Sequence, residues 1–286
     1  MRPGERGEVS LTSVLMACTL LVVVLGATLG MFEGFIAKAG DQTRRTDSQD
    51  AARSAVDRIA RDLRNLASPT PDQPQAVDLA LGRDLIFKTV DSAGPNAGLN
   101  ATNTKRVRYC LDGAGSLREQ TQTWTTATIP AVPSASGCPA AGWDPGSAIA
   151  ATSLVNGTTD PVFTYNSAVL TDISAIHVEL LVDTDVARLP PATSLSTGVF
   201  LRNQNRRPTA SFSWAPTSGG VVLNGSASVD PEGDPLEYRW FNGATQVGTG
   251  ITFTYTPLAA GSVHQIRLEV SDPAGLTAST TQSVTA

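Results

Sequence analysis

The sequence predicts an α+β protein with a long N-terminal helix, a β-rich middle portion and a C-terminal β-sandwich. An uncharged run that passes into an amphipathic helical pattern predicts the helix. Short alternating segments between turn clusters predict strands in the remainder. Only 6% of the residues are aromatic and 16% are charged, which suits short strands and many turns better than a helical enzyme.

The N-terminal run is long enough to cross a membrane. The 24 residues from Val9 to Phe32 contain no Asp, Glu, Lys or Arg. As a helix rising about 1.5 Å per residue they extend roughly 36 Å, which spans the hydrocarbon core of a bilayer. Arg2 and Arg6 precede the run and favour a cytoplasmic N-terminus. We therefore expect a single-pass protein in contact with membrane lipid, with an extracellular C-terminal portion.

Three glycines in and just after this run share one helical face. Gly26, Gly30 and Gly34 follow one another at four-residue steps. Small residues at this spacing let two helices approach closely in lipid, so we expect a helix-packing face here. The alternative is that glycine is simply common in membrane helices.

The helical pattern continues beyond the membrane run. Over residues 41–67 the apolar residues recur at steps of three and four, which predicts one apolar stripe. Pro69 and Pro71 are expected to end the helix near Ala67. The stripe consists of Ala52, Val56, Ile59, Leu63 and Leu66.

The leader MRPGERG (residues 1–7) followed by such a helix (residues 8–67) resembles a type IV prepilin or pseudopilin. The resemblance implies that a prepilin peptidase cuts between Gly7 and Glu8 and methylates the new N-terminus. It also implies that other pilin or pseudopilin subunits are partners, and that the protein reaches a pilus or the cell surface. Thr12 stands where the family has a glutamate that aids subunit docking.

Two other readings of the same segment are open. A secretory signal peptide could end at the A-x-A site Ala37-Lys38-Ala39, so that the mature chain starts at Gly40 or Asp41. A lipoprotein signal could be read in residues 15–18, which end in Cys18. The apolar run continues well beyond Cys18, where a mature lipoprotein normally becomes polar.

Residues 76–203 are expected to form a β-rich, pilin-like head. Apolar and polar residues alternate from Arg106 to Leu111, as in a half-buried strand, and Asp112-Gly113 predicts a hairpin to the next strand. Residues 125–154 are rich in Ala, Pro, Ser and Gly, and we expect a long loop. The clearest strand candidates are residues 85–91, 105–112, 116–124, 161–166 and 175–185.

Cys110 and Cys138 lie in this polar middle portion, and we expect them to form a disulfide in an oxidising compartment. The bond would tether the long loop to the hairpin and, in the chain-entropy model, stabilise the head by roughly 3 kcal/mol. The alternative is a pair of unpaired thiols. The third cysteine, Cys18, lies in the apolar run.

The C-terminal residues 207–286 predict a separate module after a hinge in the run TSLSTGVFLRNQNRRPTAS, with Asn203–Pro208 as the linker. Six or seven short strands with a turn every 8 to 12 residues predict an immunoglobulin-like sandwich with Tyr238 and Trp240 in its core. The runs RPTASF, SASVDPEGDPLEYRW and IRLEVSDPAGLTAS resemble a PKD domain. The resemblance implies an extracellular spacer or adhesion module with a possible glycan or protein ligand.

Four acidic residues of this module could suggest a Ca²⁺ site, because hard cations prefer clustered oxygen ligands. They are Asp230, Glu232, Asp234 and Asp272. We favour the alternative in which aspartates shape a tight turn through bonds to the backbone, and we expect no metal.

No catalytic motif is evident. His177 and His264 fall in separate strand patterns of different predicted domains. The net charge of −5 gives no electrostatic footprint for nucleic acid. We therefore expect no enzyme activity, no cofactor and no nucleic-acid partner. The expected function is that of a minor pilin or pseudopilin subunit. The alternative is a secreted or membrane-anchored surface protein that binds glycan or protein through its sandwich.

Overall fold

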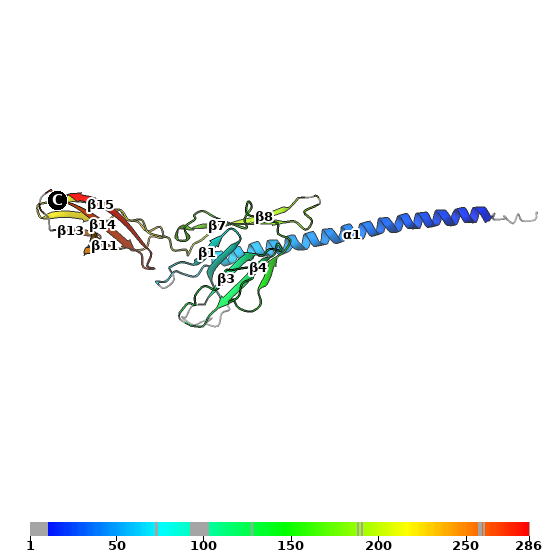
Figure 1. The fold of residues 1–286 in the computed structure, drawn as a ribbon, viewed down its shortest axis with the longest axis horizontal. Coiled ribbons are helices and arrows are strands. Elements are labelled where there is room, and N and C mark those ends of the chain that lie inside the picture. Colours follow the sequence, from blue (N-terminus) through cyan, green and yellow to red (C-terminus); the bar gives the residue numbers. More distant parts are fainter. Residues whose placement is uncertain are drawn as a thin grey trace, which may run out of the picture. The chain divides into compact units, whose positions relative to one another are not determined.

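The computed structural model confirms the α+β class (Figure 1). The chain divides into two units, residues 1–50 and 51–286. The structure describes residues 11–71, 74–91, 103–126, 128–187, 189, 191–256, 259 and 261–285.

Helix α1 (Leu11–Arg64) is unbroken. It ends three residues earlier than the prolines predict, because the chain leaves the helix to join a sheet. Leu66 forms a bridge with Thr89, and the amide of Ala67 donates a 3.0 Å hydrogen bond to the carbonyl of Lys88. The amide of Val90 in turn donates to the carbonyl of Asn65 at 2.9 Å, which gives one of the backbone acceptors at the helix end a partner.

The head contains two antiparallel sheets, of strand orders β1-β2-β3-β4-β5 and β6-β7-β8. The hairpin expected at Asp112-Gly113 is confirmed as the β3–β4 connection. The strands are β1 (Val77–Leu81), β2 (Asp84–Val90), β3 (Thr104–Leu111), β4 (Leu117–Thr123), β5 (Ala148–Ala151), β6 (Phe163–Tyr165), β7 (Ala175–Val182) and β8 (Thr193–Phe200).

The apolar stripe of α1 is the centre of the head. Ile59, Leu63 and Leu66 are fully buried, in one cluster with side chains from both sheets. Leu85 and Phe87 of β2 lie opposite Tyr109 and Val107 of β3, and all four belong to that cluster. Figure 1 shows β1, β3 and β4 beside the C-terminal end of α1. The stripe predicted from the sequence is therefore buried as expected.

Three strands of the head were not expected. β1 precedes the first predicted strand, and β5 lies within the stretch predicted as a long loop. β8 occupies the start of the run predicted as a hinge. β8 pairs over its whole length with β7, from Ala175↔Phe200 to Val182↔Thr193. Partner strands therefore override the weak strand signal of these segments.

The linker residues are held by hydrogen bonds. Gln204 and Asn205 are each only 2% exposed. The side chain of Gln204 accepts from the amide of Ala76 and donates to the carbonyl of Leu170. Asn205 Nδ2 donates to Asp272 Oδ2 at 2.7 Å. Two residues of the predicted linker are therefore buried and hydrogen-bonded, as buried amides generally are.

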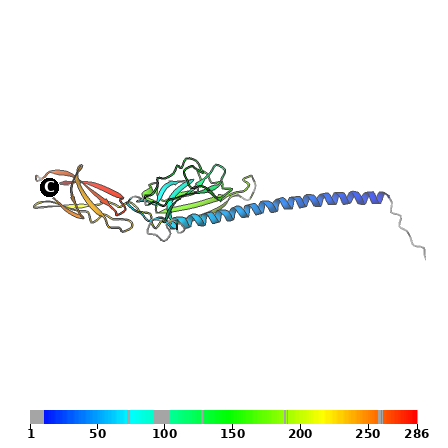
Figure 2. The ribbon, with the colours of Figure 1, turned by 90° about the horizontal axis from the view of Figure 1, so that it is seen from below.

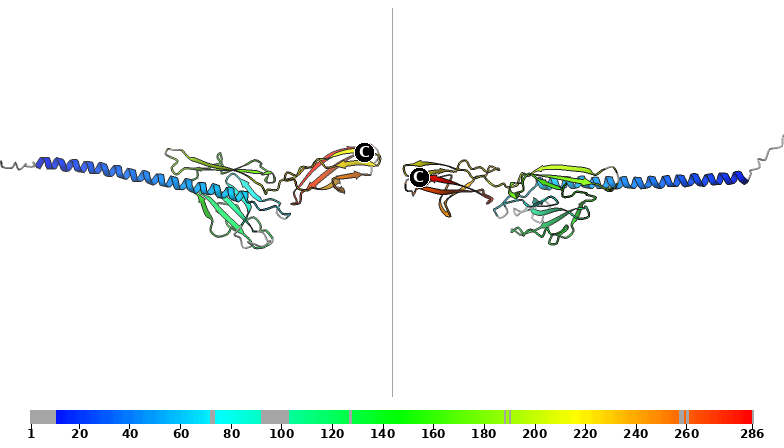
Figure 3. Two further views of the ribbon diagram at one scale, coloured as in Figure 1. Left: turned by 180° about the vertical axis from the view of Figure 1, so that it is seen from behind. Right: turned by 45° about the horizontal axis from the view of Figure 1, so that its top comes forward.

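The C-terminal module is a two-layer sandwich, with sheets β13-β10-β9 and β12-β11-β14-β15, drawn in yellow to red in Figures 2 and 3. Trp240 is fully buried in its core, and the ring meets Phe212 edge-on at 5.2 Å. Tyr238 packs partly buried against that core. The strands are β9 (Ser213–Thr217), β10 (Gly220–Asn224), β11 (Glu237–Asn242), β12 (Thr245–Thr249), β13 (Thr252–Tyr255), β14 (Val263–Ser271) and β15 (Thr277–Thr285).

We predict that Ile59→Ala destabilises the head by about 2–5 kcal/mol, because the lost side chain leaves a cavity at the helix–sheet contact. Arg61→Ala is the matched control on the same helix: Arg61 is exposed and its loss should change stability by less than about 0.5 kcal/mol. Thermal unfolding of the full chain in detergent measures both. Equal melting temperatures for the two variants would contradict the central role of the stripe.

Candidate functional site

The first candidate site is the apolar part of α1, within residues 11–50. It is the one helix among the described residues that is long and apolar enough to cross a membrane, judged by length and composition. Its large apolar side chains are exposed from Leu11 to Ile36. Exposed apolar surface of this extent marks a membrane or protein contact.

The three predicted packing glycines leave one face of this helix open. A Cβ atom added at Gly26, Gly30 or Gly34 would meet nothing within 4 Å. The residues are therefore not required by contacts within the described part of this chain. Their role in packing against another helix stays a prediction.

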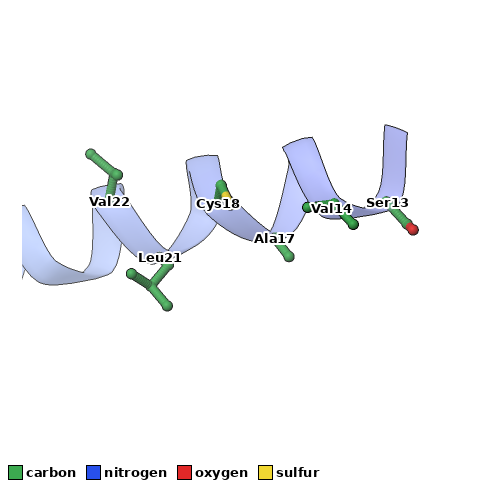
Figure 4. A pocket seen from close by; sticks show the side chains of 6 residues that line it. All are labelled: Ser13, Val14, Ala17, Cys18, Leu21 and Val22. Atoms are coloured by element: carbon green, nitrogen blue, oxygen red, sulfur yellow. The ribbon is translucent and has the colours of Figure 1, made fainter. Parts of the chain in front are cut away.

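A second small-residue stretch lies nearer the N-terminus and was not predicted. Ser13, Ala17 and Cys18 line a shallow hollow on the helix surface together with larger neighbours such as Leu21 (Figure 4). The four-residue spacing of Ser13 and Ala17 is the sequence signal that could have found it. The predicted cleavage site, Gly7 and Glu8, lies outside the described residues.

The second candidate site is the face of sheet β1–β5 that points away from α1. The sequence predicts that β3 is buried on one face only, and this prediction is wrong, because β3 is also buried on the face opposite α1. Arg106 and Arg108 of β3 are each 1% exposed. Residues of the stretch between Trp124 and Gly146 cover them, and we call this stretch the cover loop.

Arg108 is bound on every side. Its Nε and Nη2 donate to the two carboxylate oxygens of Asp84 at 2.9 and 2.6 Å. Its Nη1 donates to Gln120 Oε1 at 2.9 Å, and Nη2 also reaches the carbonyls of Ala135 and Gly137 in the cover loop. A bidentate carboxylate and several acceptors compensate the cost of burying this charge.

Arg106, two residues earlier on the same face of β3, has a similar set of partners. Its Nε donates to Asp78 Oδ2 at 2.7 Å, and its Nη1 donates to Gln122 and to the carbonyl of Pro130. The Trp124 ring lies 5.7 Å from the guanidinium carbon. Arg106 therefore holds the cover loop through a backbone carbonyl and through Trp124.

The predicted disulfide is confirmed and holds the same loop. Cys110 on β3 is bonded to Cys138, with a Cα–Cα distance of 6.0 Å. Trp143 lies 5.9 Å from the guanidinium carbon of Arg108, and its indole nitrogen donates to the carbonyl of Ser134. The covalent bond and the arginine contacts thus act on the same segment.

A polar contact joins α1 to β3 beside the apolar stripe. Tyr109 donates from its hydroxyl to Asp62 Oδ2 at 2.8 Å. Burial raises the pKa of Asp62, and this effect exceeds the opposing effect of the Tyr109 hydrogen bond. Arg58 donates to Glu119 at 2.7 Å, and this bond raises the pKa of Arg58.

Asp112 in the β3–β4 turn has the opposite balance. Its Oδ1 accepts from the amides of Ala114 and Ser116, each at 2.9 Å, and its Oδ2 accepts from Arg118 at 2.7 Å. Burial acts to raise the pKa of Asp112, but these hydrogen bonds together hold it below its ordinary value.

Of the four acidic residues considered for a Ca²⁺ site, Asp230 and Asp272 shape turns, and Glu232 accepts a hydrogen bond from Arg206. Asp230 Oδ1 accepts from the amides of Glu232 and Asp234, which confirms the predicted turn. Asp272 caps the β14–β15 turn by accepting from the amide of Leu276. Over the described ranges, no group of three or more His, Cys, Asp or Glu residues is arranged to hold a metal.

The two histidines lie apart in the described fold. His177 is exposed on β7. His264 lies on β14, where its ring contacts Tyr255 edge-on and Nε2 lies 3.0 Å from the hydroxyl of Ser262. These contacts are structural ones within the sandwich.

Comparison with known proteins identifies the C-terminal module. A family model described as bacterial Ig domain matches residues 203–285. The crystal structure of the PKD1 domain of Vibrio anguillarum Epp is 25% identical in sequence, covering 29% of this chain and 96% of that domain at a TM-score of 0.26. No curated protein matches the sequence. The chain therefore combines an apolar N-terminal helix with a bacterial Ig domain, the organisation of an extracytoplasmic surface protein.

We predict that the double variant Cys110→Ser, Cys138→Ser loses about 3 kcal/mol of stability, because the unfolded chain regains the entropy of an open loop. The cover loop should also become sensitive to protease while α1 stays protected. Denaturant unfolding and limited proteolysis with mass mapping measure the two effects. Cleavage at unchanged sites and rates would show that the arginine contacts alone hold the loop.

We predict opposite effects at neutral pH for two carboxylate variants. Asp62→Asn should raise the melting temperature, because the raised pKa of Asp62 means that its ionised form is disfavoured by folding above about pH 4. Asp112→Asn should cost about 1–3 kcal/mol, since it weakens bonds to an ionised carboxylate. The Asp112 effect should fade as the pH falls through its depressed pKa. Melting curves between about pH 2.5 and about pH 7, which bracket the ordinary pKa values of carboxyl groups, measure both effects. Two effects of the same sign would contradict the assignment.

Proposed function

We propose that this chain is a non-enzymatic minor pilin or pseudopilin subunit of a type IV pilus or type II secretion-like filament. The observation that carries the proposal is the change of character along a single helix. Helix α1 is apolar and exposed on all sides from Leu11 to Phe32, and from Ala52 onward it is buried along one stripe only. A simple membrane anchor needs the first property and has no use for the second.

The head supports an extracytoplasmic position. A disulfide such as Cys110–Cys138 persists in an oxidising compartment. The face of the sheet opposite α1 is closed by the cover loop, so α1 and the loop together enclose both faces. The head therefore has no open sheet face on β1–β5 and is continuous in sequence with the apolar helix, which suits a subunit displayed outside the membrane.

The bacterial Ig domain supports a low-copy or tip position. It follows the head in sequence as a further sandwich with its own core. A module of this size on every subunit would crowd a regularly packed shaft. We therefore assign the chain to a minor component that presents the module outside the cell, with prepilin peptidase and other pilin-like subunits as partners.

The second candidate function is a surface protein that binds glycan or protein through its Ig domain. The family match alone favours it, because it requires no assembly. In this case the N-terminal helix would be a removed signal sequence or a plain anchor. The mature N-terminus distinguishes the two functions.

We predict that the mature protein starts at Glu8 and carries one added methyl group. Intact mass measurement and N-terminal sequencing of the protein from its native membrane test this. The matched control is the same measurement from cells that lack prepilin peptidase, where the leader, residues 1–7, should remain attached. A start at Gly40 or Asp41 would reject the subunit proposal and support a secreted protein.

A further inference from the structure

Strand β15 presents an open edge. It is the last strand of the sheet β12-β11-β14-β15, and among the described residues β14 is its only hydrogen-bonded neighbour strand. All nine residues of β15 pair with β14 without a register shift. Only Val284 is buried, and the other residues are exposed or half-buried. In an antiparallel ladder every second residue directs its N–H and C=O away from its partner, so β15 offers a regular row of free backbone groups.

Most other sheet edges of the described structure carry features that oppose further pairing. β1, β5 and β12 have register shifts against their partners. β9 contains Pro216, and β6 and β13 are three and four residues long. Short, bulged or proline-containing edges are the usual protection against edge-to-edge association. Only β8 and β15 are long and regular, without proline or charge.

The sequence of β15 is complementary to itself in the antiparallel direction. If Thr281 lies opposite its own copy, Ser279 lies opposite Ser283 and Thr277 opposite Thr285, all on the outer face of the sheet. The result is an unbroken row of hydroxyl pairs, which are favourable cross-strand neighbours.

The inner face gives the same result. In this register Ala278 lies opposite Val284, and Thr280 lies opposite Gln282. Apolar residues therefore meet apolar ones and polar residues meet polar ones. No charged side chain of β15 would meet a like charge in a second copy.

β8 does not fit as well. Centred on Thr197, it would place the exposed apolar side chain of Phe200 opposite the polar Ser194. A register centred between two residues would place outward side chains opposite inward ones. The self-complementary edge is therefore β15.

We propose that β15 is a homotypic pairing edge, through which the Ig domains of two copies of this chain join into one continuous antiparallel sheet centred on Thr281. The partner is a second copy because the edge matches its own sequence in charge, side-chain class and register. Confinement of both copies to one surface raises their effective concentration, so a short edge of modest affinity suffices. This inference does not depend on the filament proposal, since a plain membrane anchor would confine the chains equally.

Disulfide trapping in the full-length protein tests the proposal. The background variant is Cys18→Ser, which removes the exposed free thiol. Thr281→Cys should form a dimer on mild oxidation in native membranes, because residues directly opposite each other lie about 5 Å apart. The matched control is Ser213→Cys on edge strand β9, which is also exposed. We expect at least about 10-fold more dimer from Thr281→Cys, consistent with a contact held at disulfide distance in one strand pair and not in the other.

The register supplies a sharper test. Ser279→Cys or Ser283→Cys alone should trap little dimer, since each residue lies four positions, roughly 13 Å, from its own copy. Co-expression of the two differently tagged variants should trap the mixed dimer. Thr281→Lys should abolish trapping at the Ser279/Ser283 pair, because two like charges would lie opposite each other, while the melting temperature stays unchanged.

Three outcomes would overturn the proposal. Equal dimer from Thr281→Cys and Ser213→Cys would indicate random collision. A mixed Ser279/Ser283 dimer no stronger than the single-variant dimers would exclude the register. Trapping of Thr281→Cys mainly to a different protein would show that the edge accepts another extended chain. None of these outcomes alters the expected N-terminus, so the filament proposal is judged separately.

Discussion

The structure of the head depends on burial of one apolar stripe of α1. A helix with its stripe exposed would not remain on a soluble head, and the sheets of the head would lose their common core without it. Ala52, Ile59, Leu63 and Leu66 are fully buried there, in the same cluster as both sheets. The same helix is apolar on all sides in its first half, where lipid can replace protein contacts. The change from all-round to one-sided hydrophobicity along one helix is the observation that carries the functional proposal.

The opposite face of sheet β1–β5 shows a different way to close a core. Instead of apolar side chains it buries two arginines, and each guanidinium has a carboxylate on one side and loop carbonyls on the other. Such a face is stable only while every donor is satisfied, because an unpaired buried charge costs several kcal/mol. The disulfide restricts the cover loop to positions near these donors. The Cys110–Cys138 bond and the arginine contacts thus hold the same loop. Without either of them, the loop would cover the two guanidinium groups less closely, and their donors would lose acceptors.

The sequence was sufficient where the signal is local or strongly periodic. The helical stripe, the Asp112-Gly113 hairpin, the disulfide and most strands of the sandwich follow from spacing and turn chemistry. The sequence was insufficient where contacts with distant segments of the chain determine the local structure. β8 contains Ser, Thr and Gly, and it is a strand because β7 lies beside it. The arginines of β3 were expected toward solvent, since nothing in the local pattern shows that a loop rich in Pro and Ala will return to cover them. Gly26, Gly30 and Gly34 could be placed on a helix, but packing against a second helix stays a prediction, because it is a property of an assembly and not of one chain.

The edge strands of the sheets add a further constraint, because their unpaired backbone N–H and C=O groups can pair with another chain. A sheet that must remain monomeric normally ends in short, bulged, charged or proline-containing strands, and most edges of this protein do. β15 lacks all of these features although it is the longest edge strand described, equal in length to its partner β14. Six of the eight described edge strands carry such a feature, and β8 is the other one that does not, so an unprotected nine-residue edge needs its own explanation. β15 has no charged residue. When it is paired antiparallel with a second copy of itself, apolar residues lie opposite apolar ones and polar residues opposite polar ones only in the register centred on Thr281.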